Sequence, residues 1–506
     1  MLMTPAMKNL FFCLICFFSL KIQAQKITYS EQQKKDNSNI SFEVLGKFAT
    51  SYLIYKNITR QHYISLYNHE MKLVDNVHLD FLPERAFNID FINYPDHFYM
   101  IYQYQRNNIV YCAAVNIGAD GKKITEPNIL DTTNIGFFAD NKIYTTTFSE
   151  DKKKIFIYKR NVRNDFLTIA TKLFDQNLIL LDSTRQVVDY NRRKEIYSDF
   201  SVDNNGNYLF AKETKIRLDD KAETLEIYIR KPNVDSFYVF DLQLQGKLIE
   251  EPIIKIDNLN KKYIVNAFYF ENRRDDIEGL YTAVVDDSKL KVNFAFNVFS
   301  ESLKNTLNTN EKYNFSFDNL TPKNIIVKRS GGFIIISEDF YTESLYSNNS
   351  WTRNNSFNNL SSSGDYYMYS PYYNSYRSSD NYNRDQSTRY YYNDIVIASV
   401  DSSLQLQWNS AIHKKQYDVE NDNFLSYSLL NSGKEIHFLF IERNKQNEIV
   451  SNHSLFPDGE IKRNATLKST AENYEFMPKL GKQVGSTQMI IPYLYLSRIG
   501  FAKIDF

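Results

Sequence analysis

The chain has 506 residues, of which 43% are hydrophobic and 15% aromatic, enough apolar material for a sizeable core. Its 60 basic and 60 acidic residues balance, so no overall positive field attracts nucleic acid or an anionic membrane surface. Only 15 residues are glycine, so the turns are expected to use Asp, Asn and Ser, whose side chains hydrogen-bond to nearby backbone.

Residues 1–24 have the features of a secretory signal peptide. Lys8 provides the positive charge, an apolar run ends at Leu20, and Ala24 is the small residue before the expected cleavage point. The alternative, an uncleaved membrane anchor, is disfavoured because this run is shorter than the roughly 20 residues that a spanning helix needs. The sequence therefore predicts an exported protein (periplasmic, outer-surface or extracellular) with no integral membrane segment after signal cleavage.

Cys112 is the only cysteine outside this leader, so the exported chain is expected to form no internal disulfide. It lies in the apolar run from Ile109 to Val115. That setting predicts a buried, unreactive thiol rather than a nucleophile.

The rest of the chain repeats one pattern of short strands. Its most regular element is a strand that is apolar at nearly every position, which predicts burial on both faces of a sheet. Eight such strands are expected, at Ser51–Tyr55, His97–Tyr102, Lys154–Tyr158, Asn207–Ala211, Tyr263–Tyr269, Phe333–Ile336, Ile436–Ile441 and Met489–Tyr495.

Each apolar strand is expected to be the second of four, after a shorter strand and before a third strand and a more polar fourth. The third strands are predicted at Ile64–Asn68, Ala113–Asn116, Ile169–Asp175, Phe237–Asp241, Tyr281–Asp286, Ile395–Asp401, Ser454–Asp458 and Phe501–Asp505. Four strands repeated in this way are typical of β-propeller blades. We therefore predict an all-β fold in which residues 25–506 form a single eight-bladed β-propeller, with seven blades as the alternative count.

The last repeat lacks a fourth strand after Phe501–Asp505. Lys26–Ser30, just before the first repeat, is predicted to supply it. Sharing one blade between both ends of the chain removes an exposed strand edge and closes the ring.

Two insertions lengthen the interval between Asp286 and Asp401. Residues 301–320 are predicted as a short helix or an irregular loop. Residues 341–392, within the sixth blade, consist largely of Tyr, Asn, Ser and Arg. Three interpretations of this second insertion stand: a polar hairpin without fixed structure, a protein-binding surface of the composition that paratopes use, and a glycan-binding surface of stacking tyrosines.

Polar residues flank the second insertion on two neighbouring strands. Glu338 and Asp339 end one strand, and Asn393 and Asp394 begin the next, so they are expected to face each other at the base of a paired stem. The candidate binding residues are Glu338, Tyr341, Trp351, Tyr366, Tyr372, Tyr376, Tyr391, Asn393, Asp394 and Trp408.

Sequence motifs of catalysis and metal binding are missing. None of the seven histidines belongs to a His-x-x-x-His pair, and the chain contains no Gly-x-Ser-x-Gly elbow and no glycine-rich phosphate loop. No catalytic residue, metal or cofactor is therefore predicted. An enzyme that acts on glycans or peptides at the channel mouth stays open as the main alternative, since a pair of carboxylates could come from any of the 60 acidic residues.

A further alternative is an outer-membrane β-barrel, because Ala502, Ile504 and Phe506 share one face of an aromatic-terminated strand. Barrel strands alternate apolar and polar residues. The second strands expected here are apolar throughout, which favours the propeller.

Several strings resemble an uncharacterised family of exported bacterial β-propeller proteins. They are Gly331–Glu338, Tyr391–Ile397 after a tyrosine-rich spacer, Gln407–Trp408, His413–Gln416, Phe148–Tyr158 and Val202–Asn207. The resemblance spans most of residues 140–460 and implies a propeller fold and export, but no reaction. This chain departs from the family in a longer spacer and a shortened segment near Glu301.

These features predict an exported, non-catalytic binding or scaffolding propeller of the bacterial cell envelope. Its expected partner is a protein or a glycan of the envelope, and no nucleic acid is expected to bind.

Overall fold

The computed structural model describes residues 25–31, 40–136, 142–216, 220–308, 319–344, 351–352, 388–419, 421–444, 447–467, 474–496 and 498–506. These residues form antiparallel β-sheets almost throughout, as the alternation of strand and turn signals predicts. The expected signal peptide, residues 1–24, lies outside the described part.

The first three sheets have four strands each, joined in sequence order. They consist of β2 (Ile40–Phe48), β3 (Ser51–Ile58), β4 (Gln61–Tyr67) and β5 (Leu73–His78); of β6 (Phe87–Asn93), β7 (His97–Arg106), β8 (Ile109–Gly118) and β9 (Asn128–Asn134); and of β10 (Tyr144–Phe148), β11 (Lys154–Arg163), β12 (Phe166–Asp175) and β13 (Leu180–Asp189).

An eight-stranded sheet follows, in which two four-stranded groups are joined by a single residue pair, Ala222 and Ile249. The groups consist of β14 (Glu195–Val202), β15 (Tyr208–Lys215), β16 (Ala222–Arg230) and β17 (Tyr238–Asp241), and of β18 (Leu248–Asp257), β19 (Lys262–Phe270), β20 (Gly279–Asp286) and β21 (Lys291–Val298).

Two more sheets complete this series. One has the path β22 (Leu320–Val327), β23 (Phe333–Ser344), β25 (Thr388–Val400) and β26 (Leu406–Ile412), with β24 (Trp351–Thr352) and β27 (Gln416–Val419) at its sides. The other consists of β28 (Tyr427–Asn431), β29 (Ile436–Asn444), β30 (Asn447–Leu455) and β31 (Ile461–Arg463).

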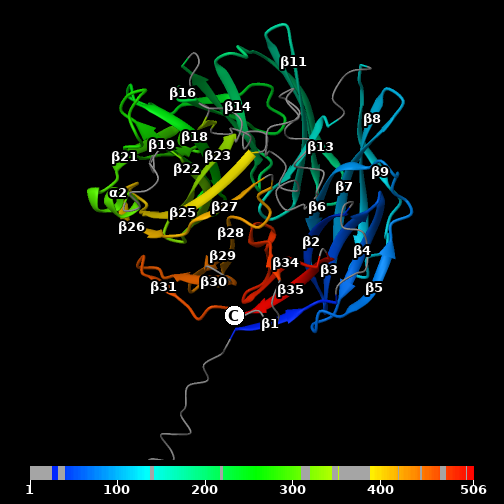
Figure 1. Cartoon of the computed structure of the whole chain (residues 1–506). Coiled ribbons are helices and arrows are strands. Elements are labelled where there is room, and N and C mark those ends of the chain that lie inside the picture. Colours follow the sequence, from blue (N-terminus) through cyan, green and yellow to red (C-terminus); the bar gives the residue numbers. More distant parts are fainter. Residues whose placement is uncertain are drawn as a thin grey trace, which may run out of the picture.

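The final sheet combines both ends of the described chain. β1 (Lys26–Tyr29) pairs antiparallel with β35 (Arg498–Asp505), so that Lys26 lies opposite Asp505. β35 pairs in turn with β34 (Gln488–Tyr495), which pairs with β32 (Glu475–Phe476) and β33 (Lys482–Gly485) around the 3-10 turn η5 (Pro478–Leu480). The expected strand from the N-terminal side therefore completes the last sheet, and the blue and red ends of the ribbon meet in Figure 1.

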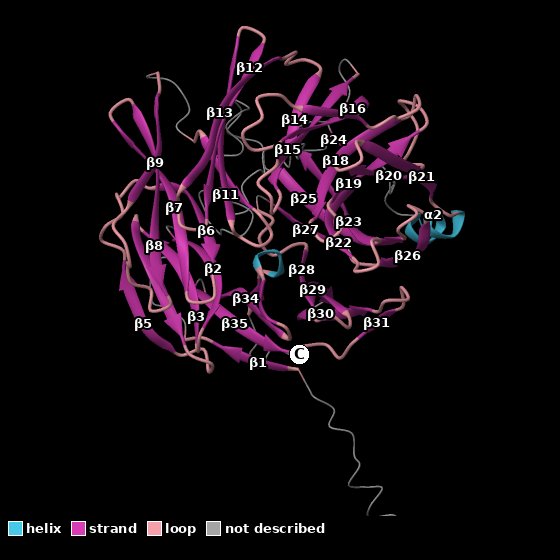
Figure 2. Cartoon of the chain, turned by 180° about the vertical axis from the view of Figure 1, so that it is seen from behind, coloured by secondary structure: helices cyan, strands magenta, loops and turns pink. Residues whose placement is uncertain are grey.

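Hydrophobic clusters fill the spaces between successive sheets. Eight clusters of buried residues lie between neighbouring groups: seven join one group to the next along the chain, and the eighth joins the last group to the first. One of them packs Phe501 of the final sheet against Phe42 of the first, with the ring centroids 5.2 Å apart. The sheets thus follow one another around the molecule in Figure 2, and the fold is all-β and propeller-like.

The expected apolar strands lie inside second strands of these groups, where both faces are buried, except that Asn207 directly precedes β15. Two expected third strands were misplaced: Ser454–Asp458 shares only Ser454 and Leu455 with β30, and Phe237–Asp241 lies outside the third strand altogether. Phe237–Asp241 corresponds to β17, which pairs with the outer side of β16, and the third strand is β16 itself. Half of the side chains in the first part of β16 are exposed, so its sequence, Ala222–Arg230, lacks the continuous apolar run that marked the other strands.

The shorter insertion contains a helix, α2 (Glu301–Asn308), while residues 309–318 lie outside the described part. Ser300 Oγ accepts a hydrogen bond from the backbone N–H of Leu303 at 3.2 Å and so caps the first turn. Leu303 and Leu307 are buried against the neighbouring sheets, which explains why these residues are helical rather than irregular.

Bulges in the first strands place polar residues in the left-handed backbone region. Asn88, Asp199 and Glu251 have φ values of 50°, 53° and 47°, and each lies where the register shifts. Asn88 Nδ2 donates to the backbone carbonyl of Tyr144 at 2.7 Å, and Asp199 Oδ2 accepts from the backbone N–H of Ile254 at 2.9 Å. Each of these contacts ties a first strand to the first strand of the next group.

Cys112 is fully buried, as predicted, and burial raises the pKa of its thiol. Among the described residues, no helix is both long enough and apolar enough to cross a membrane.

Candidate functional site

The tyrosine-rich insertion begins as a paired extension of the sixth group. β23 and β25 continue their pairing from Phe340 and Tyr392 to Ser344 and Thr388. β24 pairs with the outer side of β23, and β27 pairs with β25. We call this four-stranded extension, residues 340–344, 351–352, 388–392 and 416–419, the stem. It confirms the expected paired stem.

A bulge marks the base of the stem. The register shifts between Glu338 and Phe340, so that Asp339 faces Asn393 and Asp394. Asn393 Nδ2 donates to Asp339 Oδ2 at 3.0 Å, and both side chains are buried. Burial raises the pKa of Asp339 to about 7. The structure therefore brings these polar side chains together as the sequence predicts.

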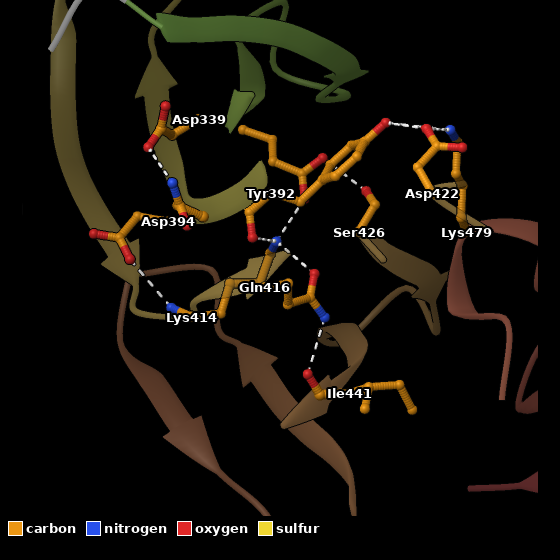
Figure 3. Close-up of polar contacts among 11 residues, drawn as sticks. Asp339, Tyr392, Asp394, Lys414, Gln416, Asp422, Ser426, Ile441 and Lys479 are labelled. Carbon is orange, nitrogen blue, oxygen red and sulfur yellow. Dashed lines mark hydrogen bonds and ion pairs between the residues drawn. The ribbon is translucent and has the colours of Figure 1, made fainter. Parts of the chain in front are cut away.

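A buried ion pair lies directly beneath the stem. Lys414 Nζ is 2.7 Å from Glu338 Oε1, and the two side chains are 1% and 0% exposed. The same ammonium group donates to Tyr392 O and to Gln416 Oε1, both at 3.0 Å, as Figure 3 shows. Burial lowers the pKa of Lys414, and the neighbouring Glu338 carboxylate opposes that effect.

Further contacts connect this ion pair to the next two sheets. Ser426 Oγ, beside β28, donates to Glu338 Oε2 at 2.7 Å. Tyr392 Oη donates to Asp422 Oδ2 at 2.6 Å, and Lys479 of η5 lies 2.5 Å from the same carboxylate oxygen. Because these groups are buried or half-buried and come from three sheets, they fix the direction in which the stem leaves the molecule. We call Glu338, Lys414, Tyr392, Asp422 and Lys479 the anchor.

The two faces of the stem differ because successive residues of a strand point to opposite sides. Phe340 and Tyr392 are buried with Leu425 on the face that packs against the propeller-like body. Tyr341, Tyr391 and Tyr417 lie on the other face. Tyr341 pairs with Tyr391, and Tyr391 pairs with Tyr417, so the three rings form one row across three strands.

This tyrosine row is ordered and partly open to solvent. The rings of Tyr341 and Tyr391 stack with centroids 4.5 Å apart, and those of Tyr391 and Tyr417 are 6.0 Å apart. Tyr417 is 50% exposed. Such a row presents flat apolar faces with hydroxyl groups at their edges, the combination that proteins use at contact surfaces.

A charged pair borders the tyrosine row. Tyr391 Oη donates to Glu343 Oε2 at 2.9 Å, and Arg389 Nη1 donates to Tyr391 Oη at 3.2 Å. The Arg389 guanidinium also lies 5.6 Å from the ring centre of Tyr417. Partly buried Tyr391 has a raised pKa, so its hydroxyl stays protonated as a donor at neutral pH.

The structure assembles half of the candidate binding residues at this place: Glu338, Tyr341, Tyr391, Asn393 and Asp394. The backbone of Trp351 belongs to β24 and pairs with Glu343. Tyr366, Tyr372 and Tyr376 lie outside the described residues. Trp408 is elsewhere: it pairs with Ser399, near the opposite end of β25, and its ring fills the space beside Gly459.

Sequence reasoning missed Lys414, Tyr417 and Arg389 as members of the site. In the sequence, Lys414 and Gln416 were noted only as part of the string His413–Gln416, which resembles the family of exported propellers. The alternation of Gln416, Tyr417, Asp418 and Val419 was the available signal for β27, but four residues are too few to identify a strand by periodicity.

A second group of buried or half-buried charged residues lies on β14, β15, β18 and β22, and its member Lys323 lies near the anchor. Burial raises the pKa values of Asp199 and Glu213 to about 7 and also raises the pKa of Glu251. Lys323 lies near Glu338 and Glu251, and burial lowers its pKa to about 8 despite both carboxylates. Glu251 and Lys323 therefore bring a carboxyl group with a raised pKa near a weakly basic amine. In the described part of the chain, no three His, Cys, Asp or Glu side chains are arranged to hold a metal ion.

No protein-family model matches the chain, and no curated protein matches its sequence. Solved structures that match it include a prolyl endopeptidase, at 9% identity over 83% of this chain with a TM-score of 0.34. This chain spans 55% of that endopeptidase.

Two other matches cover most of both chains. They are the polysaccharide lyase Uly1, at 10% identity over 82% and 89% with a TM-score of 0.38, and the apocarotenoid oxygenase of Synechocystis, at 7% identity over 95% and 93% with a TM-score of 0.34. At TM-scores below 0.5, nothing of these proteins' activities or sites is carried over to this chain.

Proposed function

We propose that the chain is an exported, eight-bladed β-propeller of the bacterial cell envelope that binds a protein partner without catalysing a reaction. The observation that carries the binding role is the arrangement of the stem. One face is buried against the body, while the other presents the row of Tyr341, Tyr391 and Tyr417 with Arg389 and Glu343 beside it.

The eight clusters between successive sheets support the blade count. They follow the chain in order, and the cluster that contains Phe42 and Phe501 joins the last group to the first. A propeller with eight blades has eight such interfaces, each filled by the facing sides of two sheets. The expected leader and the resemblance to exported propellers support export.

The anchor supports recognition because it fixes the stem before a partner arrives. A surface that is already ordered loses less conformational entropy on binding than one that must first fold. Tyr and Arg side chains favour a protein partner, because both are enriched at the centres of protein interfaces. A glycan is the alternative ligand, since sugar rings also stack on tyrosine.

The test compares two double variants. Tyr391→Ser with Tyr417→Ser removes two rings of the row, and Tyr104→Ser with Tyr111→Ser removes a matched pair elsewhere, whose half-buried rings stack across β7 and β8 at 4.9 Å. Both proteins are used to capture partners from native envelope extract and are applied to a glycan array. Loss of the captured protein with the first variant alone supports the proposal. Equal capture by both variants, or binding to glycans alone, overturns it.

The charged group around Lys323 favours an enzyme as a second candidate function. An amine with a pKa of about 8 near the Glu251 carboxyl group, whose own pKa burial raises, could move protons at neutral pH. The test is turnover of a panel of glycans and peptides by the purified protein and by Lys323→Met. Turnover that Lys323→Met abolishes establishes the enzyme, and no turnover by the unaltered protein excludes it for that panel.

A further inference from the structure

The stem extends from one end of the sheets. A cavity lies at the opposite end, where first strands turn into second strands. It has a volume of about 330 Å³. Its walls come from three successive sheets: the end of β2 from Leu45 to Phe48, the segment Asn93–Pro95 at the end of β6, and the turn between β10 and β11 with Asp151 and Lys152. We call it the three-sheet pocket. The tyrosine row, by contrast, belongs to the sixth sheet and lies at the other end, where second strands lead into third strands.

Polar contacts between the sheets build the pocket. Asn93 Nδ2 donates to Leu45 O at 2.5 Å, and Lys152 Nζ donates to Asn93 O at 2.6 Å. Tyr94 Oη donates to Lys152 O at 2.7 Å. The chain of contacts crosses all three sheets, so the walls hold a fixed shape.

Gly46 keeps one side of the pocket clear. Its φ of 141° is unfavourable for residues with a side chain, and a Cβ atom at this position would have no atom within 4 Å. On the opposite wall, the ring of Tyr94 stacks on His97 with centroids 4.8 Å apart. Tyr94 and Pro95 thereby add a fixed apolar surface to a pocket that Leu45 and Phe48 also line.

The pocket contains two cationic side chains that form no ion pair among the described residues, although the Lys47 ammonium group lies 5.9 Å from the ring centre of Tyr52. Among the described residues, Lys152 Nζ has Asn93 O as its hydrogen-bond acceptor and forms no ion pair, and Lys47 forms neither contact. Lys152 is half-buried, and burial lowers its pKa, with Lys482 nearby adding to the effect. A half-buried ammonium group without a counter-ion is unfavourable, and an anion in the pocket would relieve that cost.

Asp151 supplies the complementary acceptor. Its Oδ1 accepts from Ser149 Oγ at 2.6 Å and from the backbone N–H of Lys153 at 3.0 Å, whereas Oδ2 has no partner among the described residues. The pocket therefore offers two ammonium groups, one acceptor oxygen for a hydroxyl group and an apolar wall. Lys47, Lys152 and Asp151 leave it with one net positive charge, which matches a ligand that carries one negative charge and a hydroxyl group.

We propose that the three-sheet pocket binds one acidic pyranose unit, a sugar whose oxyanion contacts Lys47 and Lys152 and whose hydroxyl group donates to Asp151. The cavity volume lies at the small end of ligand sites, which suits a single ring. The oxyanion is a carboxylate or a sulfate, and both have the charge and the acceptor oxygens that ammonium groups bind.

The experiment measures binding of glucuronate, glucose 6-sulfate and glucose by saturation-transfer NMR and calorimetry. Glucuronate or glucose 6-sulfate is expected to bind at least about tenfold more tightly than glucose, which corresponds to roughly one buried charge contact. The preference between the two acidic sugars identifies the oxyanion. Equal binding of all three sugars, or no binding of either acidic sugar, overturns the proposal.

Three variants locate the site. Lys47 is exposed, so Lys47→Gln should not disturb folding. It is expected to weaken binding about fivefold, and Lys152→Gln is expected to weaken it about tenfold. Lys153→Gln is the matched control, since Lys153 is exposed in the same turn but does not line the pocket. An equal effect of Lys47→Gln and Lys153→Gln overturns the assignment. The double variant of Tyr391 and Tyr417 should bind the acidic sugar normally, which separates this proposal from the role of the stem.

Discussion

Lys414 and Glu338 form an ion pair of 2.7 Å in which neither side chain is more than 1% exposed. The pair lies between the body and the stem, and its remaining hydrogen-bond capacity is used by Tyr392, Gln416 and Ser426. Removal of one partner leaves an uncompensated charge in a place that water does not reach.

Lys414→Met should therefore lower the free energy of unfolding by about 3 to 5 kcal/mol, the usual cost of breaking a buried pair. Urea denaturation followed by tryptophan fluorescence measures this change. The double variant Lys414→Met with Glu338→Gln is the control, because it removes both charges and should recover much of the loss. A double variant that is less stable than Lys414→Met would contradict this account of the pair.

The stability of the protein should depend on pH through Glu213. The folded chain keeps a proton on this buried carboxyl up to about pH 7, whereas the unfolded chain releases it near pH 4.5. The folded state therefore binds more protons between these values, and the free energy of unfolding falls as pH rises through this window.

Glu213→Gln is neutral at every pH and removes that fall. We expect it to be more stable than the unaltered protein at pH 8 by up to roughly 3 kcal/mol, and the difference to vanish near pH 4. Denaturation series at pH 4, 6 and 8 measure it, with the exposed Glu223→Gln as the control. Parallel pH profiles for all three proteins would show that Glu213 ionises freely in the fold.

Substitutions of Asp199 should measure the free-energy cost of its left-handed backbone conformation. Its φ of 53° suits glycine, so Asp199→Gly should be about 1 kcal/mol more stable than Asp199→Ala, although both lose the hydrogen bond to Ile254. Ser201, two residues later in β14, has no such backbone, and there the alanine variant should be the more stable. Thermal unfolding of the four variants tests both orders, and the same order at both positions would contradict the role of φ.

Deletion of residues 25–31 should expose the edge of β35, which pairs with β1. An unpaired strand edge promotes association, so the shortened protein is expected to melt at a lower temperature and to form oligomers. Calorimetry and light scattering measure these effects. A synthetic peptide of residues 25–31, added in excess, should restore the original melting temperature, and an unchanged melting temperature without it would show that β1 does not close the sheet.

The second strands were predictable from sequence because burial on both faces leaves a local mark, an apolar residue at nearly every position, as in Phe333–Ile336. The pairing of Lys26 with Asp505 was predictable because the last repeat lacked a fourth strand and an additional strand preceded the first repeat. β16 was missed because exposed residues at its start break the apolar run.

The base of the stem was predictable because Asp339 and Asn393 lie at the two ends of one insertion. The ion pair of Lys414 with Glu338 was not, since it depends on how β27 folds back beside β25. The three-sheet pocket likewise depends on the hydrogen bond from Lys152 to Asn93 of another sheet, and no local sequence pattern in either segment predicts that contact.

The pairing of β1 with β35 also determines when the fold can be completed during synthesis. Tyr29 meets Ala502, a partner that is made more than 470 residues later. Throughout that interval β1 is a strand without a neighbour, while the sheets between them can already form from local hairpins. Contacts of such sequence separation are slow to form. Until this last step, the unpaired edges of β1 and β35 leave the growing chain open to association with other chains.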